Sequence, residues 1–280
     1  IWHEPFRRGV LFAAFCHDLG KANDQFQAMV RQQRKAQQAI RHEALSMLIV
    51  HETALRDWLK AVPNEVDTLN FSFWAAAGHH RKFPPSNPAP GTGTHISIFL
   101  GHPDFRRTLI IGARKLGLGD PPPLDDCTWR LTGVDSPSRR LNQLSVRASA
   151  YWEACSDEQR RFLAAVKACV IAADVAGSAL PKQGEKIIPW ISEALRRRPT
   201  VGQLQKIVTD RLGGKTPRPF QEALGNTRAR VVLAEAGCGN GKTIGAYLWA
   251  ARRAPGKRLF FSYPTTGTAT EGFRDYLIDP

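Results

Sequence analysis

The stretch that decides the fold is "FAAFCHDLGKANDQFQ", residues 12–27, in which an apolar run ends in a histidine followed by an aspartate. Val10, Ala14 and His17 share one face at helical spacing, so residues 5–19 are predicted to form a helix that ends before a glycine. An imidazole and a carboxylate are costly to bury unless they are paired, hydrogen-bonded or bound to a metal ion. The partners of this pair must therefore come from elsewhere in the chain.

Helical patterns continue on both sides of this stretch. They predict helices from about residue 23 to 60, with a break near Ile40, and over residues 66–83 and 156–178. The last of these is predicted to turn five residues inward: Phe162, Val166, Cys169, Val170 and Ala173. Residues 96–150 are mixed and interrupted by prolines, and they give no clear assignment. Because alternating patterns are almost absent up to about residue 195, this part of the chain is expected to be mainly helical.

The pattern changes after residue 196. The runs "ARVVLAEA" (229–236) and "KRLFFSYP" (257–264) have the composition of buried strands, and they flank a glycine-rich loop and a helix over about 244–253. This order of strand, loop, helix and strand is typical of the start of a parallel α/β domain. We therefore predict a helical domain over residues 1–200, a linker over 201–217, and the beginning of an α/β domain over 218–280.

Composition favours an anionic partner and a reducing compartment. The 280 residues carry a formal net charge of +14, which fits nucleic acid, although a basic surface without a specific partner is the alternative. The five cysteines are scattered without a CxxC pair, which argues against disulfides and a thiolate zinc site and favours the cytoplasm. The apolar run 162–180 is interrupted by Lys167 and Asp174, so we predict a buried helix rather than a membrane span. The chain starts at Ile1, and we expect it to be a piece of a longer protein.

A phosphate-binding loop is predicted at "AGCGNGKT", residues 236–243. It follows a predicted strand and opens a predicted helix, where glycines turn backbone N–H groups toward a phosphate. The expected ATP-binding residues are Gln221, Gly239, Gly241, Lys242 and Thr243, with Gln221 as the adenine contact and Thr243 as the magnesium contact. A glycine turn without a ligand is the alternative. Since no acidic segment follows to activate water, this chain is not expected to hydrolyse ATP by itself.

A second candidate site combines histidines and aspartates from distant segments. Asp174 is the most telling member, because a carboxylate within an apolar helix needs a cationic partner. Imidazoles and carboxylates without thiolates suit Mn, Fe, Co, Ni or Zn, and Asp18 could bridge two such ions. The candidate ligands are His17, Asp18, His42, His79, His80 and Asp174. Each also has an ordinary interpretation, for example His42 as a surface histidine or Asp174 as the partner of an arginine.

The motifs "HDLGK", "RHE", "GHH" and "ADVAGSAL" resemble those of the HD phosphohydrolase superfamily. More narrowly, they resemble the HD nuclease domain of the CRISPR-associated helicase–nuclease of type I systems. The later "RPFQ", "EAGCGNGKT" and "YPTTGTATEGF" resemble the start of a superfamily 2 helicase. The residues of the phosphate loop and of "TGTATEGF" are similar to those of the type I-G branch. The resemblance covers nearly the whole chain except roughly residues 84–150.

The resemblance implies a mainly α fold, in which an all-helical HD domain precedes the first β-α-β elements of a RecA-like helicase lobe. It implies that Asp18 and Lys21 are catalytic, that the six ligands above bind two transition-metal ions, and that Ser178 matches the serine after the last aspartate. It further implies cleavage of single-stranded DNA, recruitment by a guide-RNA surveillance complex, and ATP with Mg for the full-length helicase. A phage-encoded inhibitor is a further candidate partner, and no membrane is expected.

Two departures from the family pattern keep alternatives open. Arg81 stands where a glycine usually follows the double histidine, and the family has an earlier ligand histidine on a separate helix. His3 lies only about one helix before His17, so we expect that earlier histidine to lie before Ile1. The alternatives are an HD phosphohydrolase acting on nucleotides, or a catalytically incomplete piece that binds DNA or a protein partner.

Overall fold

The computed structural model describes residues 3–31, 37–62, 93–237, 239–263 and 265–278. The chain divides into two compact units, Ile1–Lys182 and Gln183–Pro280. Each unit is described by itself.

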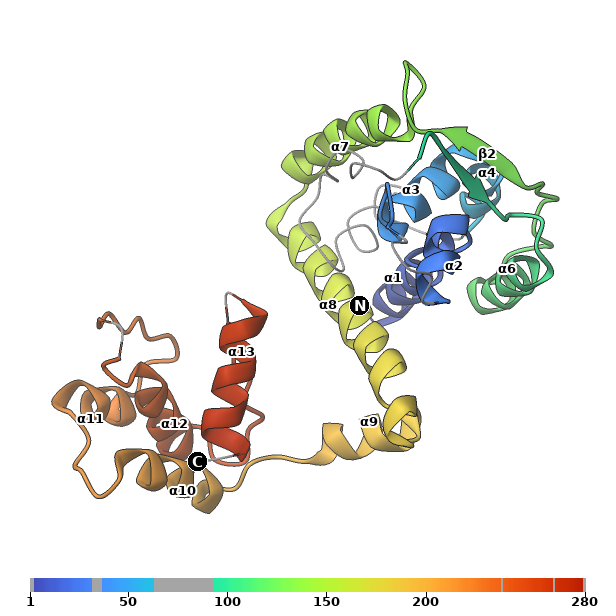
Figure 1. The fold of residues 1–280 in the computed structure, drawn as a ribbon. Helices are drawn as coiled ribbons and strands as arrows, with labels where there is room; N and C mark the ends of the chain where they lie inside the picture. Colours follow the sequence, from blue (N-terminus) through green and yellow to red (C-terminus); the bar gives the residue numbers. More distant parts are fainter. Residues whose placement is uncertain (1–2, 32–36, 63–92, 238, 264, 279–280) are drawn as a thin grey trace. The chain divides into compact units, whose positions relative to one another are not determined.

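Most of the first unit is helical (Figure 1). Its elements are α1 (His3–Cys16), the 3-10 turn η1 (Leu19–Lys21), α2 (Asp24–Val30), α3 (His42–Glu52), α4 (Leu55–Leu59), β1 (His95–Ile98), α6 (Pro103–Leu116), β2 (Cys127–Arg130), α7 (Pro137–Ala154) and α8 (Asp157–Ala179). The predicted first helix is confirmed, although it ends at Cys16, and so is the long helix after residue 156. The helix predicted from residue 23 to near Ile40 is shorter than expected, because α2 ends at Val30 and residues 37–41 are not helical. The helix predicted over 66–83 lies outside the described residues.

A small antiparallel sheet lies in the region around residues 96–150, for which no clear assignment was predicted. Strands β1 and β2 pair with Ile96 opposite Trp129. The amide of Phe99, just after β1, donates to the carbonyl of Ala22, 2.9 Å away, and thereby ties the sheet to the end of η1. The first unit is thus mainly α, as predicted, with one small sheet added to its helices.

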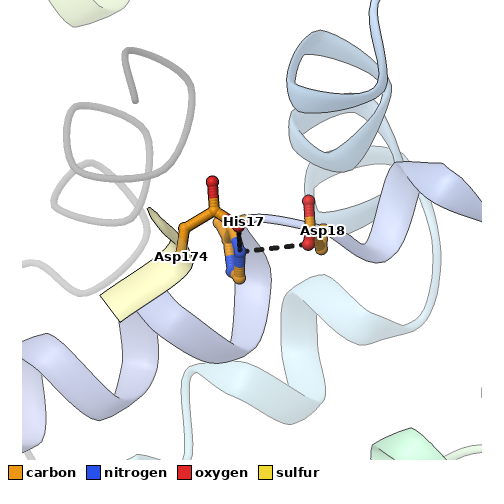
Figure 2. A group of neighbouring side chains, drawn as sticks. All are labelled: His17, Asp18 and Asp174. Carbon is orange, nitrogen blue, oxygen red and sulfur yellow. Dashed lines mark ion pairs between the residues drawn. The ribbon is translucent and has the colours of Figure 1, made fainter. Parts of the chain in front are cut away.

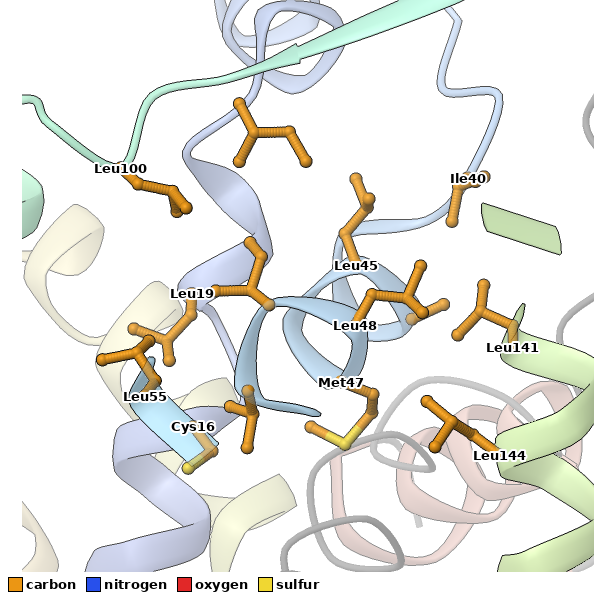
Figure 3. Packing of buried hydrophobic residues seen from close by; sticks show 14 of the residues in the cluster. Cys16, Leu19, Ile40, Leu45, Met47, Leu48, Leu55, Leu100, Leu141 and Leu144 are labelled. Atoms are coloured by element: carbon orange, nitrogen blue, oxygen red, sulfur yellow. The ribbon is translucent and has the colours of Figure 1, made fainter. Parts of the chain in front are cut away.

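Helix α3 lies at the centre of the core (Figure 3). All residues from His42 to Val50 are buried, and its apolar side chains pack on residues from α1, η1, α7 and the loops between them. A helix that is apolar on all sides is stable only when other elements surround it. The two polar residues of its first turn, His42 and Glu43, are therefore carried into the interior.

Helix α8 is buried along one stripe only. Leu163, Val166 and Val170 pack against Ala13 of α1, whereas Cys169 is exposed, contrary to the sequence prediction. Ala173 is exposed as well. A spacing of three and four residues gives one narrow apolar stripe, and the rest of the helix surface is not covered by described residues. By length and composition alone, the segment Asp157–Gln183 could cross a membrane. A single segment of this kind is weak evidence for a membrane span, because core helices of soluble proteins pass the same test.

The second unit is also mainly helical. Its elements are η2 (Pro181–Gln183, which begins in the first unit), α9 (Ile187–Arg196), α10 (Val201–Leu212), α11 (Pro219–Asn226), α12 (Lys242–Arg253), α13 (Thr266–Phe273) and the π-helical turn η3 (Arg274–Ile278). Leu204 and Val208 of α10 are buried with Tyr247 and Leu248 of α12. The predicted linker therefore contains a packed helix, and the division into an HD domain and a helicase lobe stays a prediction.

The two predicted strands of the second unit do not form. Residues 229–236 and 257–263 have no strand partner among the described residues. Val231, Leu233 and Phe260 are 89%, 83% and 79% exposed. A strand needs a neighbour to take up its backbone hydrogen bonds, and these two runs do not pair with each other. Only the loop and the helix of the predicted β-α-β order are observed.

Candidate metal centre

The His-Asp pair sits on a tight turn that is pressed against α3. Helix α1 ends at Cys16, and η1 follows after the pair. A Cβ atom on Gly20 would lie 2.0 Å from the carbonyl oxygen of His42 and 2.6 Å from the amide nitrogen of Ser46. Glycine at this position therefore allows the two backbones to meet, which brings the first motif against the third.

The hydroxyl of Ser46 joins these two motifs. Its Oγ accepts a hydrogen bond from the amide of Gly20 at 2.8 Å. It lies 2.8 Å from the carbonyl oxygen of His17 and 2.9 Å from that of His42, to which it can donate. Because Ser46 is fully buried, these bonds are shielded from water and fix the turn relative to α3.

The imidazole of His17 points one nitrogen at two carboxylates (Figure 2). Its Nδ1 lies 2.6 Å from the carbonyl oxygen of Ala14, which can only accept, so Nδ1 carries a proton. Its Nε2 lies 3.1 Å from Oδ2 of Asp18 and 3.8 Å from Oδ1 of Asp174. One ligand atom from each of His17, Asp18 and Asp174 lies within 4.8 Å of the others, a spacing at which they could hold a metal ion.

His42 faces the other oxygen of Asp18. Its Nε2 lies 3.4 Å from Asp18 Oδ1, and its Nδ1 lies 3.4 Å from Glu43 Oε2. Glu43 is only 4% exposed and forms an ion pair with Arg41. The ring of Phe26 packs edge-on against the imidazole, with centroids 5.2 Å apart. Asp18 thus lies between two histidines, one at each carboxylate oxygen.

Cationic partners keep Asp18 ionised. Lys21 places its Nζ 2.5 Å from Asp18 Oδ2 and 5.6 Å from the centre of the Phe26 ring. Burial by itself raises the pKa of Asp18, but the neighbouring side chains of His17, His42 and Lys21 outweigh it and lower the pKa below its usual value. Burial disfavours the charged form of His17, yet Asp18 outweighs this effect and the pKa of His17 is raised.

The structure brings five of the predicted site residues together: His17, Asp18, Lys21, His42 and Asp174. They come from the end of α1, η1, the first turn of α3 and the later part of α8. His79 and His80 lie outside the described residues. His3 begins α1, and since a helix rises about 1.5 Å per residue, it starts roughly 20 Å before Cys16. His3 and His17 therefore lie at opposite ends of one helix.

Sequence analysis missed the roles of Glu43 and Ser46. Glu43 follows His42 in the motif "RHE" and was assigned no role, although it is buried against the His42 ring. Ser46 follows His42 by one helical turn in the otherwise apolar run "ALSMLIV". A small hydroxyl in such a run is the signal that could have identified it, because a buried hydroxyl needs hydrogen-bond partners.

The predicted phosphate loop has its own internal contacts. Lys242 donates from Nζ to the carbonyl oxygens of Ala236 and Gly237, at 2.6 and 2.9 Å. The side chain of Gln221 accepts from the amide of Arg218 at 2.8 Å and donates to the carbonyl of Gly241 at 2.9 Å. Gln221 thus joins the start of α11 to the loop, and its contact with adenine stays a prediction.

Comparisons with known proteins assign the family. The model described as "Cas3, HD domain" matches residues 2–179, a range that ends with α8. The chain is 46% identical over 280 residues to a protein of Myxococcus xanthus (strain DK1622) named "Putative CRISPR-associated nuclease/helicase Cas3"; the match covers 98% of this chain and 37% of that protein. No solved structure gave a significant match. Because the family model spans the segments from His17 to Asp174 that form the cluster, the chain belongs to the Cas3 HD domain family.

Proposed function

We propose that the first unit is a metal-dependent nuclease that cleaves single-stranded DNA during type I CRISPR interference. The observation that carries this proposal is the approach of His17, Asp18 and Asp174 to within 4.8 Å. More than 150 residues separate the first two from the third. Membership in the Cas3 HD domain family and the net charge of +14 support a nucleic-acid substrate.

The side chains of this cluster fit divalent transition-metal ions such as Mn, Fe, Co or Ni. The donors are imidazole nitrogen and carboxylate oxygen without thiolate, the set that such ions accept. The bond from His17 Nδ1 to the Ala14 carbonyl is the outer contact that directs Nε2 of a ligating histidine. His42 faces the second oxygen of Asp18, so we propose that His17, Asp18, His42 and Asp174 would together hold two such ions. His79 and His80 are proposed as further ligands on the sequence motif alone.

Bound ions of this kind lower the pKa of a coordinated water and stabilise the charge on a reacting phosphodiester. The residues of the chain prepare that site. Asp18 stays ionised and offers one oxygen on each side, while Glu43 beside His42 favours an orientation with Nε2 toward Asp18. The Lys21 ammonium forms an ion pair with Asp18. With a metal ion held by Asp18, the Lys21 ammonium would be free to contact a DNA phosphate.

The second unit is proposed as the start of an ATP-dependent helicase. Its loop residues Gly239 and Gly241 have positive φ angles of 73° and 78°, as a phosphate-cradling loop requires. Together with Gln221, Lys242 and Thr243 they would bind ATP and Mg in the full-length protein. That protein is proposed to act in the cytoplasm, on DNA presented by a guide-RNA surveillance complex.

The test offers three substrates to the purified protein with Mn²⁺, Co²⁺ or Ni²⁺: single-stranded DNA, duplex DNA and dGTP. We expect loss of single-stranded DNA only with metal present, and at least a hundredfold loss of that activity in His17→Ala and Asp174→Asn. Asp57→Asn is the matched control, because Asp57 is an exposed residue of α4 whose ion pair is with Lys60. Release of phosphate from dGTP with DNA left intact would favour the nucleotide phosphohydrolase instead. Binding of DNA without any cleavage would favour the incomplete fragment.

A further inference from the structure

The candidate metal centre stands between two hollows of the first unit. The larger has a volume of about 1050 Å³ and lies among α1, α2 and α6. The smaller, of about 320 Å³, lies between α1 and α8 and includes Ser178 in its wall. His17, Asp18 and Lys21 line both hollows. A pocket for a mononucleotide needs to enclose one ligand, whereas space on two sides of the reacting groups suits a chain that continues past them.

The wall of the larger hollow is mainly apolar and aromatic. Its large apolar side chains are Leu11, Phe15, Phe99, Phe105, Ile111 and Leu116. Phe15 lies directly on α6, where a Cβ atom added to Gly112 would be 2.2 Å from its ring. Ile111 is 54% exposed, which is unusual for so large an apolar side chain. Flat apolar surfaces of this kind stack or pack against nucleobases without regard to sequence.

Basic side chains accompany this apolar wall. Lys21, Arg31 and Lys115 line the same hollow. Its three acidic residues are already engaged. Asp18 belongs to the candidate metal centre and pairs with Lys21, Asp24 accepts hydrogen bonds from the backbone amides of residues 25 and 97, and Asp104 lies 3.6 Å from Arg107. The surface thus combines cations for a phosphate backbone with apolar area for bases, which is the chemistry of a groove for single-stranded nucleic acid.

We propose that the hollow among α1, α2 and α6 holds the nucleotides next to the scissile phosphate of a single DNA strand. The strand passes across His17 and Asp18 and continues into the hollow beside α8. This inference rests on the proposed function, because it assigns the flanking subsites of that same reaction. It names residues of α6, above all Ile111 and Lys115, as contacts of the bound strand.

The first test fills the hollow with a larger side chain. Ile111→Trp is compared with Val146→Trp, since Val146 is an exposed residue of α7 that does not line the hollow. We expect Ile111→Trp to weaken binding of fluorescent oligo-dT about tenfold or more, measured by anisotropy in EDTA, and to reduce DNA cleavage accordingly. Hydrolysis of bis(p-nitrophenyl) phosphate, which needs the metal centre but not a DNA groove, is measured alongside, and Val146→Trp is expected to match the wild-type protein in binding and in both hydrolysis assays. Equal binding by the two Trp variants would overturn the proposal.

The second test uses charge at two neighbouring positions of α6. Lys115 lines the hollow and Arg114 does not, although both are exposed. Lys115→Glu is expected to weaken oligo-dT binding severalfold more than Arg114→Glu, and to reduce the salt dependence of binding more strongly. Equal effects would show that only general charge matters and would overturn the proposal. If the wild-type protein hydrolyses neither DNA nor the small phosphodiester, the proposed function fails, while both binding comparisons still decide whether this hollow holds DNA.

Discussion

The candidate metal centre and the predicted phosphate loop were both identified from sequence motifs, but they differ in how much of the surrounding chain packs around them. The metal centre gathers side chains from four separate elements, and α3, which carries His42, is buried from His42 to Val50. The phosphate loop is contiguous in sequence, and its lysine bonds to carbonyls of its own loop. The run just before it is largely exposed, with Leu233 at 83%.

A motif can be recognised in a sequence whether or not the surrounding chain packs around it, but a site made of distant segments also needs that packing. A contiguous loop can keep its local backbone geometry without a sheet, because glycine adopts the positive φ angles of Gly239 and Gly241 without steric cost. A cluster assembled from distant segments exists only while the helices around it are packed. Mutations that loosen the core are therefore expected to abolish the metal centre and to leave the phosphate loop unchanged.

The largest expected effect comes from Gly20→Ala. The new Cβ would lie 2.0 Å from a carbonyl oxygen of α3, so the turn must move away from that helix. We expect a loss of several kcal/mol of unfolding free energy for the first unit, with loss of metal binding and DNA cleavage. Gly119→Ala is the control, because nothing lies within 4 Å of its added Cβ. Thermal unfolding measures the effect, and a Gly20→Ala variant as stable as Gly119→Ala would refute the close approach.

Ser46→Ala is expected to have the next largest effect. It removes the hydroxyl that joins the His-Asp turn to α3 and leaves the buried amide of Gly20 without this acceptor. The expected cost is about 1–3 kcal/mol, with weaker metal binding as the turn loosens. Ser46→Cys, which keeps a weak donor and acceptor of similar size, should recover part of the stability. Denaturant unfolding checks both variants, and unchanged stability in Ser46→Ala would contradict this role.

Helix periodicity and motif order predicted most of the first unit and the members of its cluster. The sequence predicted α1, the break before α3, and α8, and it identified Asp174 because an aspartate in an apolar helix needs partners. It could not predict β1 and β2, whose pairing joins segments about thirty residues apart without strong alternation. Nor could it predict Ser46, whose importance depends on which backbone groups meet at its hydroxyl. In the second unit, apolar composition predicted two strands that do not form, because composition alone does not provide a pairing partner.

Metal binding should weaken as the pH falls toward and below the pKa of His17. That pKa is raised above its ordinary value of 6.5, and a ligating imidazole must lose its Nε2 proton. Asp18, with its lowered pKa, stays ionised throughout this range. We expect Mn²⁺ affinity to fall by up to about tenfold per pH unit in this region, as measured by calorimetry. An affinity that is constant from pH 8 to pH 6 would exclude His17 as a ligand.

Without metal, lowering the pH toward the pKa of His17 should strengthen the contribution of this histidine to the free energy of unfolding, whereas it weakens metal binding. A raised pKa of His17 means that its pairing with Asp18 stabilises the fold most at pH values below the ordinary histidine pKa. That contribution is lost as the pH rises through the raised value. The lowered pKa of Asp18 adds stability above its ordinary value of 3.8, and this is lost as the solution becomes more acidic. Unfolding in EDTA across this pH range therefore separates the two effects from metal binding.

The smallest expected effect on DNA cleavage comes from Lys242→Ala in the predicted phosphate loop. Lys242→Ala should abolish binding of ATP to the second unit and leave metal-dependent cleavage of DNA by the first unit unchanged within error. The reason is that the described hydrogen bonds of Lys242 all end on its own loop, whereas the metal centre depends on the core around α3. Cleavage rates with and without ATP, beside binding of a fluorescent ATP analogue, measure both halves of this prediction. A Lys242→Ala variant that cleaves DNA more slowly would show that the contiguous motif and the assembled centre are coupled, and that the contrast between them does not hold in solution.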